Sequence, residues 1–213
     1  RMVRYVCAQL SNWQLDMPRL VRAHNEKRWD WHDGRWGEQV LILGLGELGQ
    51  SVAESLVVQG YKVSGWSQSP KQLRGVESLT GKPGLNAGLA RADYLINLLP
   101  LTSATRGLLD SELWARCERQ PVVMNVGRGA SLAEDDLIPA LEVGQLSGAI
   151  LDVFETEPLP PESRLWSHPN IWVTPHIASI SDPSDVIRLA IDNLRQVRAG
   201  EPPRYLVDLS REY

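Results

Sequence analysis

Residues 39–49 read QVLILGLGELG, and this stretch is the strongest indication of the fold. An apolar run of strand length leads into Gly44, Gly46 and Gly49, and a helical pattern follows at once. In such a strand–turn–helix unit the first glycine permits a tight turn, the second lets the backbone approach a pyrophosphate, and the third allows close packing. The helix N-terminus would add free amides for the phosphates. We interpret the stretch as a dinucleotide-binding turn; the alternative is three glycines that only tighten the turn.

Outward from this turn, short apolar runs alternate with amphipathic stretches, which is typical of βαβ units around a parallel sheet buried on both faces. We expect strands at 40–43, 62–66, 94–98, 122–126, 149–153 and 171–174. We expect helices at 48–59, 85–91, 111–116, 134–143 and 184–199. Pro139 lacks a backbone donor and should bend or shorten the fourth of these. The predicted fold class is α/β, a doubly wound, Rossmann-like parallel sheet.

A helical arm is expected before the turn. The first fifteen residues place their apolar side chains on one helical face, at Val3, Val6, Leu10 and Trp13. Asp16 and Pro18 then predict an N-cap and a first-turn proline for a second helix that runs through Arg28. Residues 1–36 hold seven Arg or Lys against four acids, and four of the eight tryptophans. An amphipathic helix packed on its own domain explains this pattern; a contact surface for something outside the chain is the alternative.

Composition and charge exclude several classes of protein. The 213 residues are 43% hydrophobic and 23% charged, as in ordinary globular domains. The net charge is -4, and the arm's local +3 leaves -7 elsewhere, which argues against a nucleic-acid partner. We expect no membrane span and no signal peptide. Cys7 and Cys117 are far apart and in no metal-ligand spacing, so we predict reduced thiols, a cytoplasmic location and no metal.

The second expected strand indicates which dinucleotide is preferred. An acid about 20 residues after the glycines would bind the ribose hydroxyls of NAD, yet residues 55–76 contain no Asp or Glu. Ser67, Gln68 and Lys71 stand there instead, and a hydroxyl, an amide and an ammonium would accept a 2'-phosphate that a carboxylate would repel. We therefore predict NADP as the preferred cofactor, with NAD possible.

Three segments with chemically useful side chains each follow an expected strand, at the sheet edge where ligands bind. Arg128, between two glycines, could grip a carboxylate in two parallel hydrogen bonds. His176 is suited to proton transfer near neutrality, and an acid such as Glu157 against its other nitrogen would fix its tautomer. Each residue alone has an ordinary structural explanation, whereas their joint occurrence predicts a site. The other histidines, at 24, 32 and 168, are interpreted as structural or surface groups.

Five motifs in this order resemble the D-isomer-specific 2-hydroxyacid dehydrogenases: GLGELG, LLPLTSATRGLLD, NVGRG, LDVFETEPLP and TPHIAS. The Trp-Ser end of the second strand and the HPNIWVTPHIAS context resemble the glyoxylate/hydroxypyruvate reductase branch. The resemblance implies that Arg128 binds the substrate carboxylate, that His176 protonates the carbonyl oxygen and that Glu157 pairs with His176. It implies cofactor contacts from Glu47, Leu48, Leu99, Pro100, Thr105, Val126, Gly127, Asp152 and Ser179.

The resemblance also implies three units and a small 2-oxoacid as substrate. Residues 1–37 would be a connecting and dimerisation arm, residues 38–182 the NAD(P)-binding domain, and residues 183–213 a helix and tail returning to a substrate lobe that is largely absent. We expect an NAD(P)H-dependent reductase of glyoxylate/hydroxypyruvate type that works as a homodimer. Without most of the substrate lobe, we expect this chain to bind cofactor but to reduce the 2-oxoacid slowly. A non-catalytic, dinucleotide-responsive binding module is the alternative.

Overall fold

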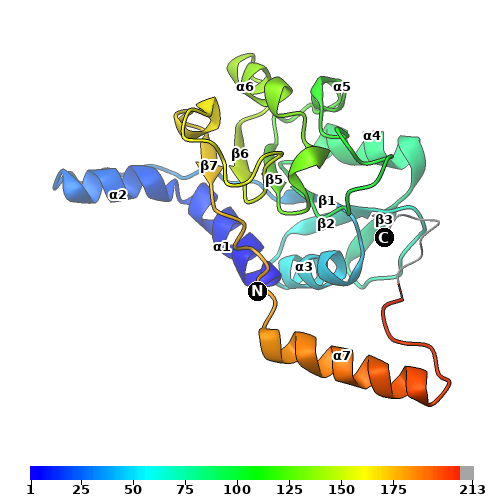
Figure 1. Cartoon of the computed structure of the whole chain (residues 1–213). Helices are drawn as coiled ribbons and strands as arrows, with labels where there is room; N and C mark the ends of the chain where they lie inside the picture. Colours follow the sequence, from blue (N-terminus) through cyan, green and yellow to red (C-terminus); the bar gives the residue numbers. More distant parts are fainter. Residues whose placement is uncertain (207–213) are drawn as a thin grey trace.

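A computed structural model describes residues 1–206 and contains a single parallel sheet (Figure 1). Its strand order is β3-β2-β1-β4-β5-β6-β7, so the order reverses between β1 and β4. A crevice outside the carboxyl ends of the strands at such a reversal is where open α/β sheets bind ligands. The strands are β1 (Gln39–Leu43), β2 (Lys62–Trp66), β3 (Val76–Leu79), β4 (Tyr94–Asn97), β5 (Val122–Asn125), β6 (Gly148–Leu151) and β7 (Ile171–Val173).

Helices cover both faces of the sheet, which confirms the predicted doubly wound α/β class (Figure 1). The α4, α5 and α6 helices pack on one face, while α1 and α3 pack on the other. The helices are α1 (Met2–Gln14), α2 (Met17–Asn25), α3 (Glu47–Val58), α4 (Gly81–Arg91), α5 (Ser111–Trp114), α6 (Glu134–Glu142) and α7 (Pro183–Arg198). Two short 3-10 turns, Gly129–Ser131 and Arg164–Trp166, lie in the loops.

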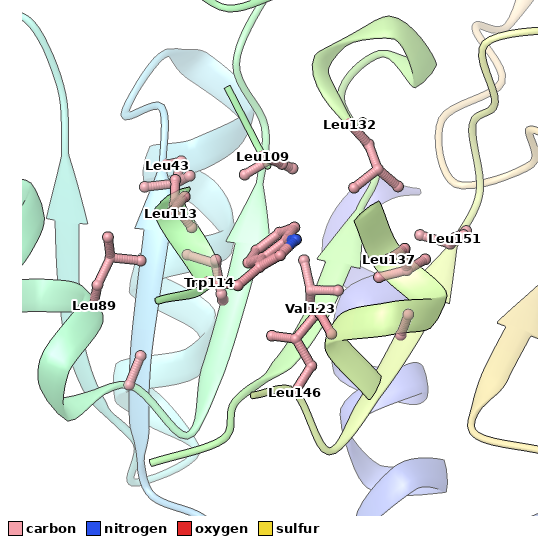
Figure 2. Close-up of a cluster of buried hydrophobic side chains, with 14 of the residues drawn as sticks. Leu43, Leu89, Leu109, Leu113, Trp114, Val123, Leu132, Leu137, Leu146 and Leu151 are labelled. Atoms are coloured by element: carbon pink, nitrogen blue, oxygen red, sulfur yellow. The ribbon is translucent and has the colours of Figure 1, made fainter. Parts of the chain in front are cut away.

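Two cores result because neighbouring residues of each strand point to opposite faces. Along β1, Leu41 and Leu43 face one core while Val40 and Ile42 face the other. Figure 2 shows the first core, with the indole of Trp114 set among leucines of both the helices and the strands. The strands are therefore apolar on both sides, as their continuous hydrophobic runs predict.

Most predicted elements are confirmed, and the differences have local causes. The sheet has one strand more than expected: β3 lies at its edge, pairs only with β2 and is half-exposed, so it lacks a long apolar run. The α4 helix begins at Gly81 rather than at residue 85, because Pro83 in its first turn is compatible with helix. The α6 helix runs through Pro139 and ends at Glu142.

The cap predicted for the second helix is wrong. Asp16 occupies the N-cap position, but with a φ of +48° its side chain caps no amide, and its carboxylate binds Arg35 at 2.9 Å instead. The helix ends at Asn25, three residues earlier than expected, because Lys27 adopts a left-handed backbone conformation and the Arg28 amide donates back to a carbonyl of the last helical turn. Such a return of the chain is a common way to end a helix.

The arm is divided between a packed helix and an exposed segment. The α1 helix packs on its own domain, as predicted, although Met2 rather than Val3 completes the buried face. Beyond α2, three tryptophans stand in solvent: Trp29, Trp31 and Trp36 are 96%, 74% and 69% exposed.

At the other end of the chain, α7 projects from the body and has no buried residue (Figure 1). Residues 207–213 of the predicted C-terminal unit lie outside the described part. Among residues 1–206, no helix is long and apolar enough to cross a membrane.

Candidate active site

The glycine turn between β1 and α3 has the geometry that its sequence predicts. Gly44 has a φ of +100° and lies close to the Leu98 carbonyl, a position that a side chain would strain. A Cβ on Gly49 would lie 1.8 Å from the Gly44 oxygen, so α3 begins in contact with the end of β1. A Cβ on Gly46 would meet nothing within 4 Å. The turn is therefore tightly packed at Gly44 and Gly49 and leaves free space beside Gly46.

The start of α3 offers groups that fit a pyrophosphate. Its N-cap is Gly46, which has no side chain to satisfy the first amides. Within residues 1–206, no acceptor binds the amides of Glu47, Leu48 or Gly49, whereas Gln50 already donates to the Gly46 oxygen. Free amides at the positive end of a helix dipole bind phosphate groups. The residues present at this turn therefore fit a dinucleotide.

The residues predicted to select NADP follow β2. The Ser67 hydroxyl donates to the Ser69 carbonyl at 2.8 Å, and the Lys71 amide donates to the Ser78 hydroxyl at 2.9 Å, so the backbone of this loop is fixed. Gln68 is exposed between them. No carboxylate of the described residues pairs with the Lys71 ammonium. The loop thus presents polar and cationic groups without a negative charge.

A buried polar network, which sequence reasoning missed, joins the loops after β4 and β5. Asn97, Asn125 and Ser131 are all 0% exposed. The Asn97 side-chain NH2 donates to Asn125 Oδ1 at 2.9 Å and to Ser131 Oγ at 2.8 Å, and Asn97 Oδ1 accepts the Leu99 amide at 3.2 Å. Asn125 in turn donates to the Arg128 carbonyl at 3.1 Å. The signal was an asparagine inside the apolar run YLINLLP, since a buried amide needs partners.

The residues expected to line the cofactor cleft lie beside this network. A Cβ on Gly127 would be 2.8 Å from the Leu99 oxygen, so the two loops nearly touch. Val126 and Leu99 are buried. The Thr105 hydroxyl donates to the Pro100 carbonyl at 2.6 Å and folds that loop back on itself. The structure gathers these five residues after β4 and β5; their contact with a cofactor stays a prediction.

His176 and Glu157 form a directly bonded pair. His176 Nδ1 lies 2.7 Å from Glu157 Oε2, and Glu157 Oε1 accepts the Phe154 amide at 2.9 Å. Partial burial raises the pKa of Glu157, but the hydrogen bonds from His176 and Phe154, with the nearby charges of His176 and Arg128, outweigh it and lower the net pKa. Because Nδ1 faces Glu157, Nε2 is the ring nitrogen free to meet a ligand.

A cavity of about 270 Å³ brings the three predicted catalytic side chains together. Arg128, Glu157 and His176 all line it, and Leu101 and Phe154 supply apolar wall. Arg128 is exposed, and its Nη1 donates to a neighbouring main-chain carbonyl at 2.8 Å. A guanidinium that can grip an anion thus shares one cavity with an imidazole that can carry a proton.

Asp152 holds the turn that presents His176. It is 1% exposed and accepts three hydrogen bonds, from the Thr174 hydroxyl and from the amides of Ile177 and Ala178. Its implied contact with the cofactor stays a prediction. Ser179, also assigned to the cofactor, is exposed just beyond this turn.

The remaining histidines have the structural roles expected of them. His32 accepts the Gly34 amide at 3.0 Å, and His168 accepts the Asn170 amide at 3.2 Å. His24 is exposed on α2. In residues 1–206, no three His, Cys, Asp or Glu side chains gather as a metal site.

Comparison with known proteins gives one consistent family. The model described as "D-isomer specific 2-hydroxyacid dehydrogenase, NAD binding domain" matches residues 8–178. The chain is 39% identical to the glyoxylate/hydroxypyruvate reductase A of Escherichia fergusonii over 215 residues, all of this chain and 69% of that protein. It is 45% identical over 172 residues to the enzyme of the same name from Serratia proteamaculans, 81% of this chain and 55% of that protein.

Solved structures give the same result. A D-isomer specific 2-hydroxyacid dehydrogenase from Xanthobacter autotrophicus Py2, crystallised with NADPH and MES, is 40% identical and superposes with a TM-score of 0.93 over 100% of this chain and 88% of that one. An NADPH-dependent glyoxylate/hydroxypyruvate reductase from Sinorhizobium meliloti, in complex with NADP and sulfate, is 38% identical with a TM-score of 0.92, over 100% and 69% of the two chains.

Proposed function

Because this chain belongs to the D-isomer specific 2-hydroxyacid dehydrogenase family, we propose that it binds NADPH and serves the reduction of a small 2-oxoacid, of the glyoxylate or hydroxypyruvate type, to the 2-hydroxyacid. One observation carries the proposal: the bonded His176–Glu157 pair shares a cavity with Arg128 at the carboxyl edge of the sheet. The proposed cofactor-binding domain is residues 38–182, preceded by the arm 1–37 and followed by the C-terminal unit from residue 183.

Three side chains divide the work on the substrate. Arg128 would hold the carboxylate in a bidentate contact and so orient the adjacent carbonyl. Protonated His176 would donate from Nε2 to the carbonyl oxygen, where negative charge develops during reduction. Glu157 would hold Nδ1 and keep the ring in this orientation, since it already makes that bond. NADPH, when bound, supplies the hydride.

Substitution of His176 tests the reaction. We expect His176→Ala to lower the rate of NADPH oxidation with glyoxylate or hydroxypyruvate by about 100-fold or more, the scale of general acid catalysis. His168→Ala is the control, because that ring accepts the Asn170 amide in a loop outside the cavity. Equal rates in His176→Ala and the parent protein would contradict the proposal. Binding of NADPH without any reductase activity would favour the dinucleotide-responsive module instead.

The preference for NADP is proposed from the loop after β2. Ser67, Gln68 and Lys71 provide no negative charge there, and the two solved relatives were crystallised with NADPH or NADP. Lys71→Ala should weaken NADPH binding by about tenfold and leave NADH binding unchanged, because only NADPH carries the 2'-phosphate. Lys62→Ala is the control, since Lys62 pairs with Glu38. Parallel calorimetric titrations measure both; tighter binding of NADH would refute the preference.

We further propose a homodimer built through residues 1–37, in the cytoplasm. The exposed tryptophans of the arm support the dimer, because large apolar surfaces on a protein commonly mark contact sites. Two free cysteines support a reducing compartment. Trp29→Ala should shift the sedimentation equilibrium toward monomer, while Trp166→Ala, outside the arm, should not. An unchanged association constant for Trp29→Ala would refute this interface.

A further inference from the structure

A directional chain of hydrogen bonds runs from α1 to the buried carboxylate behind the active site. Tyr5 Oη lies 2.6 Å from Thr174 Oγ1, and Thr174 Oγ1 lies 2.5 Å from Asp152 Oδ1. A carboxylate can only accept, so the single proton of Thr174 points to Asp152. Tyr5 must then be the donor to Thr174. The order is fixed as Tyr5 to Thr174 to Asp152.

At its Asp152 end, this chain of hydrogen bonds holds the backbone around His176. His176 has a φ of +54°, a conformation that non-glycine residues seldom adopt and that surrounding contacts must maintain. Asp152 supplies those contacts: its carbonyl accepts the His176 amide at 2.9 Å, and its carboxylate accepts the amides of Ile177 at 3.0 Å and Ala178 at 2.8 Å. The orientation of Asp152 and the orientation of the imidazole are therefore linked.

We propose that Tyr5 is a positioning residue for His176: through Thr174, its phenol holds Asp152 in the orientation that presents the imidazole to the cavity. The assignment of His176 as the proton donor rests on the function proposed above. The hydrogen-bond chain itself does not.

The surroundings of Tyr5 suit this task. Val6, Leu10 and Trp13 are buried on the same helix, so the helix that carries the phenol is fixed against the sheet. Burial raises the pKa of Tyr5 to about 12, and the nearby Asp152 charge acts in the same direction. The phenol therefore stays protonated and remains a donor throughout the physiological pH range.

The test compares two tyrosines in the full chain without cofactor. Tyr5→Phe removes the bond to Thr174, and Tyr61→Phe is the matched control, because Tyr61 also has a partly buried phenol, bonded at 3.1 Å to Gln14 of α1. Thr174→Val removes the hydroxyl in the middle of the hydrogen-bond chain, whereas Thr174→Ser keeps a hydroxyl there. Amide hydrogen exchange at Ile177 and Ala178 is measured by NMR, together with the ring resonances of His176.

We expect Tyr5→Phe and Thr174→Val to speed exchange at these two amides about threefold to tenfold, the factor that matches one net hydrogen bond. The His176 ring resonances should move in the same two variants. Tyr61→Phe and Thr174→Ser should match the parent protein. No change in Tyr5→Phe, or an equal rise in exchange across β4 and β5, would overturn the proposal, the latter because it would indicate general destabilisation.

Enzyme kinetics provide a separate readout. Tyr5→Phe should lower kcat by a similar threefold to tenfold factor, and KM for NADPH should change by a smaller factor, because the variant leaves the glycine turn intact even though it affects Asp152. A rise in KM for NADPH with kcat unchanged would contradict a positioning role. Failure of the chain to reduce any 2-oxoacid would refute the proposed function, yet the cofactor-free exchange and resonance measurements would still decide on the hydrogen-bond chain.

Discussion

Removal of the Asn97 side chain tests the claim that a buried polar network supports the site. Asn97→Ala deletes three hydrogen bonds: to Asn125, to Ser131 and from the Leu99 amide. The serine hydroxyl keeps its bond to the Arg128 carbonyl, and Asn125 Oδ1 keeps the Gly127 amide. The Leu99 amide alone is left without an acceptor in a buried place.

The expected loss of stability follows from these contacts. Each net hydrogen bond contributes about 0.5–1.5 kcal/mol, and an orphaned buried amide costs about 1–3 kcal/mol. The two lost side-chain bonds and the orphaned Leu99 amide together should lower the free energy of unfolding by about 2–6 kcal/mol, which reaches the upper range for single substitutions. NADPH affinity should fall as well, because the network fixes the loops of Leu99 and Gly127, which are predicted to face the cofactor.

Urea unfolding followed by circular dichroism measures the change, with the slope of the transition as a check for altered denatured states. The matched control is Asn193→Ala, because Asn193 makes its two bonds to the Arg204 backbone on the exposed side of α7. A surface change of this kind should cost less than about 0.5 kcal/mol. If Asn97→Ala also costs less than about 1 kcal/mol, the network does not stabilise the site and the reasoning fails.

Gly129→Ala should prevent normal folding, since its Cβ would lie 1.8 Å from the Phe154 carbonyl oxygen. Gly46→Ala should fold normally, because nothing lies within 4 Å of its Cβ. It should nevertheless bind NADPH at least about tenfold more weakly, because the methyl group would occupy the space through which the pyrophosphate approaches the backbone. Thermal melts and calorimetry separate the two, and a stable Gly129→Ala protein would show that the close contact is absent. Glu157 has a lowered pKa in the folded state, so its bonds stabilise the protein above the ordinary pKa of 4.5, and this stabilisation is lost as the pH falls through the folded-state pKa. Glu157→Gln should therefore show a smaller drop in melting temperature between pH 5 and pH 3 than the parent protein. Equal drops would refute this. Partial burial raises the pKa of Cys117 to about 12, so its thiol should be alkylated at pH 8 at least about tenfold more slowly in the native protein than in urea. Peptide mass spectrometry measures the two rates, and equal rates would contradict the protection of this thiol by the fold.

The predictable part of the fold came from strong local patterns. The apolar run before Gly44 and the helical pattern after Gly49 gave β1 and α3 to within one residue, because strand, turn and helix are encoded in adjacent residues. The edge strand β3 was missed because its side chains are half-exposed and its pairing partner is distant in sequence. The Asp16 cap failed because a tertiary contact, the bond to Arg35, competes for the carboxylate.

The sequence alone was enough to predict the class of sheet, the glycine turn and the three side chains after successive strands, because parallel strands bring their carboxyl ends to one edge. The bond from His176 Nδ1 to Glu157, and the cavity that both share with Arg128, became visible only once the chain was folded. The hydrogen bonds that Asn97 and Tyr5 make behind them were likewise visible only in the folded chain. Such partners lie far apart along the chain, and hydrogen bonding depends on distances of a few tenths of an ångström that local patterns do not encode.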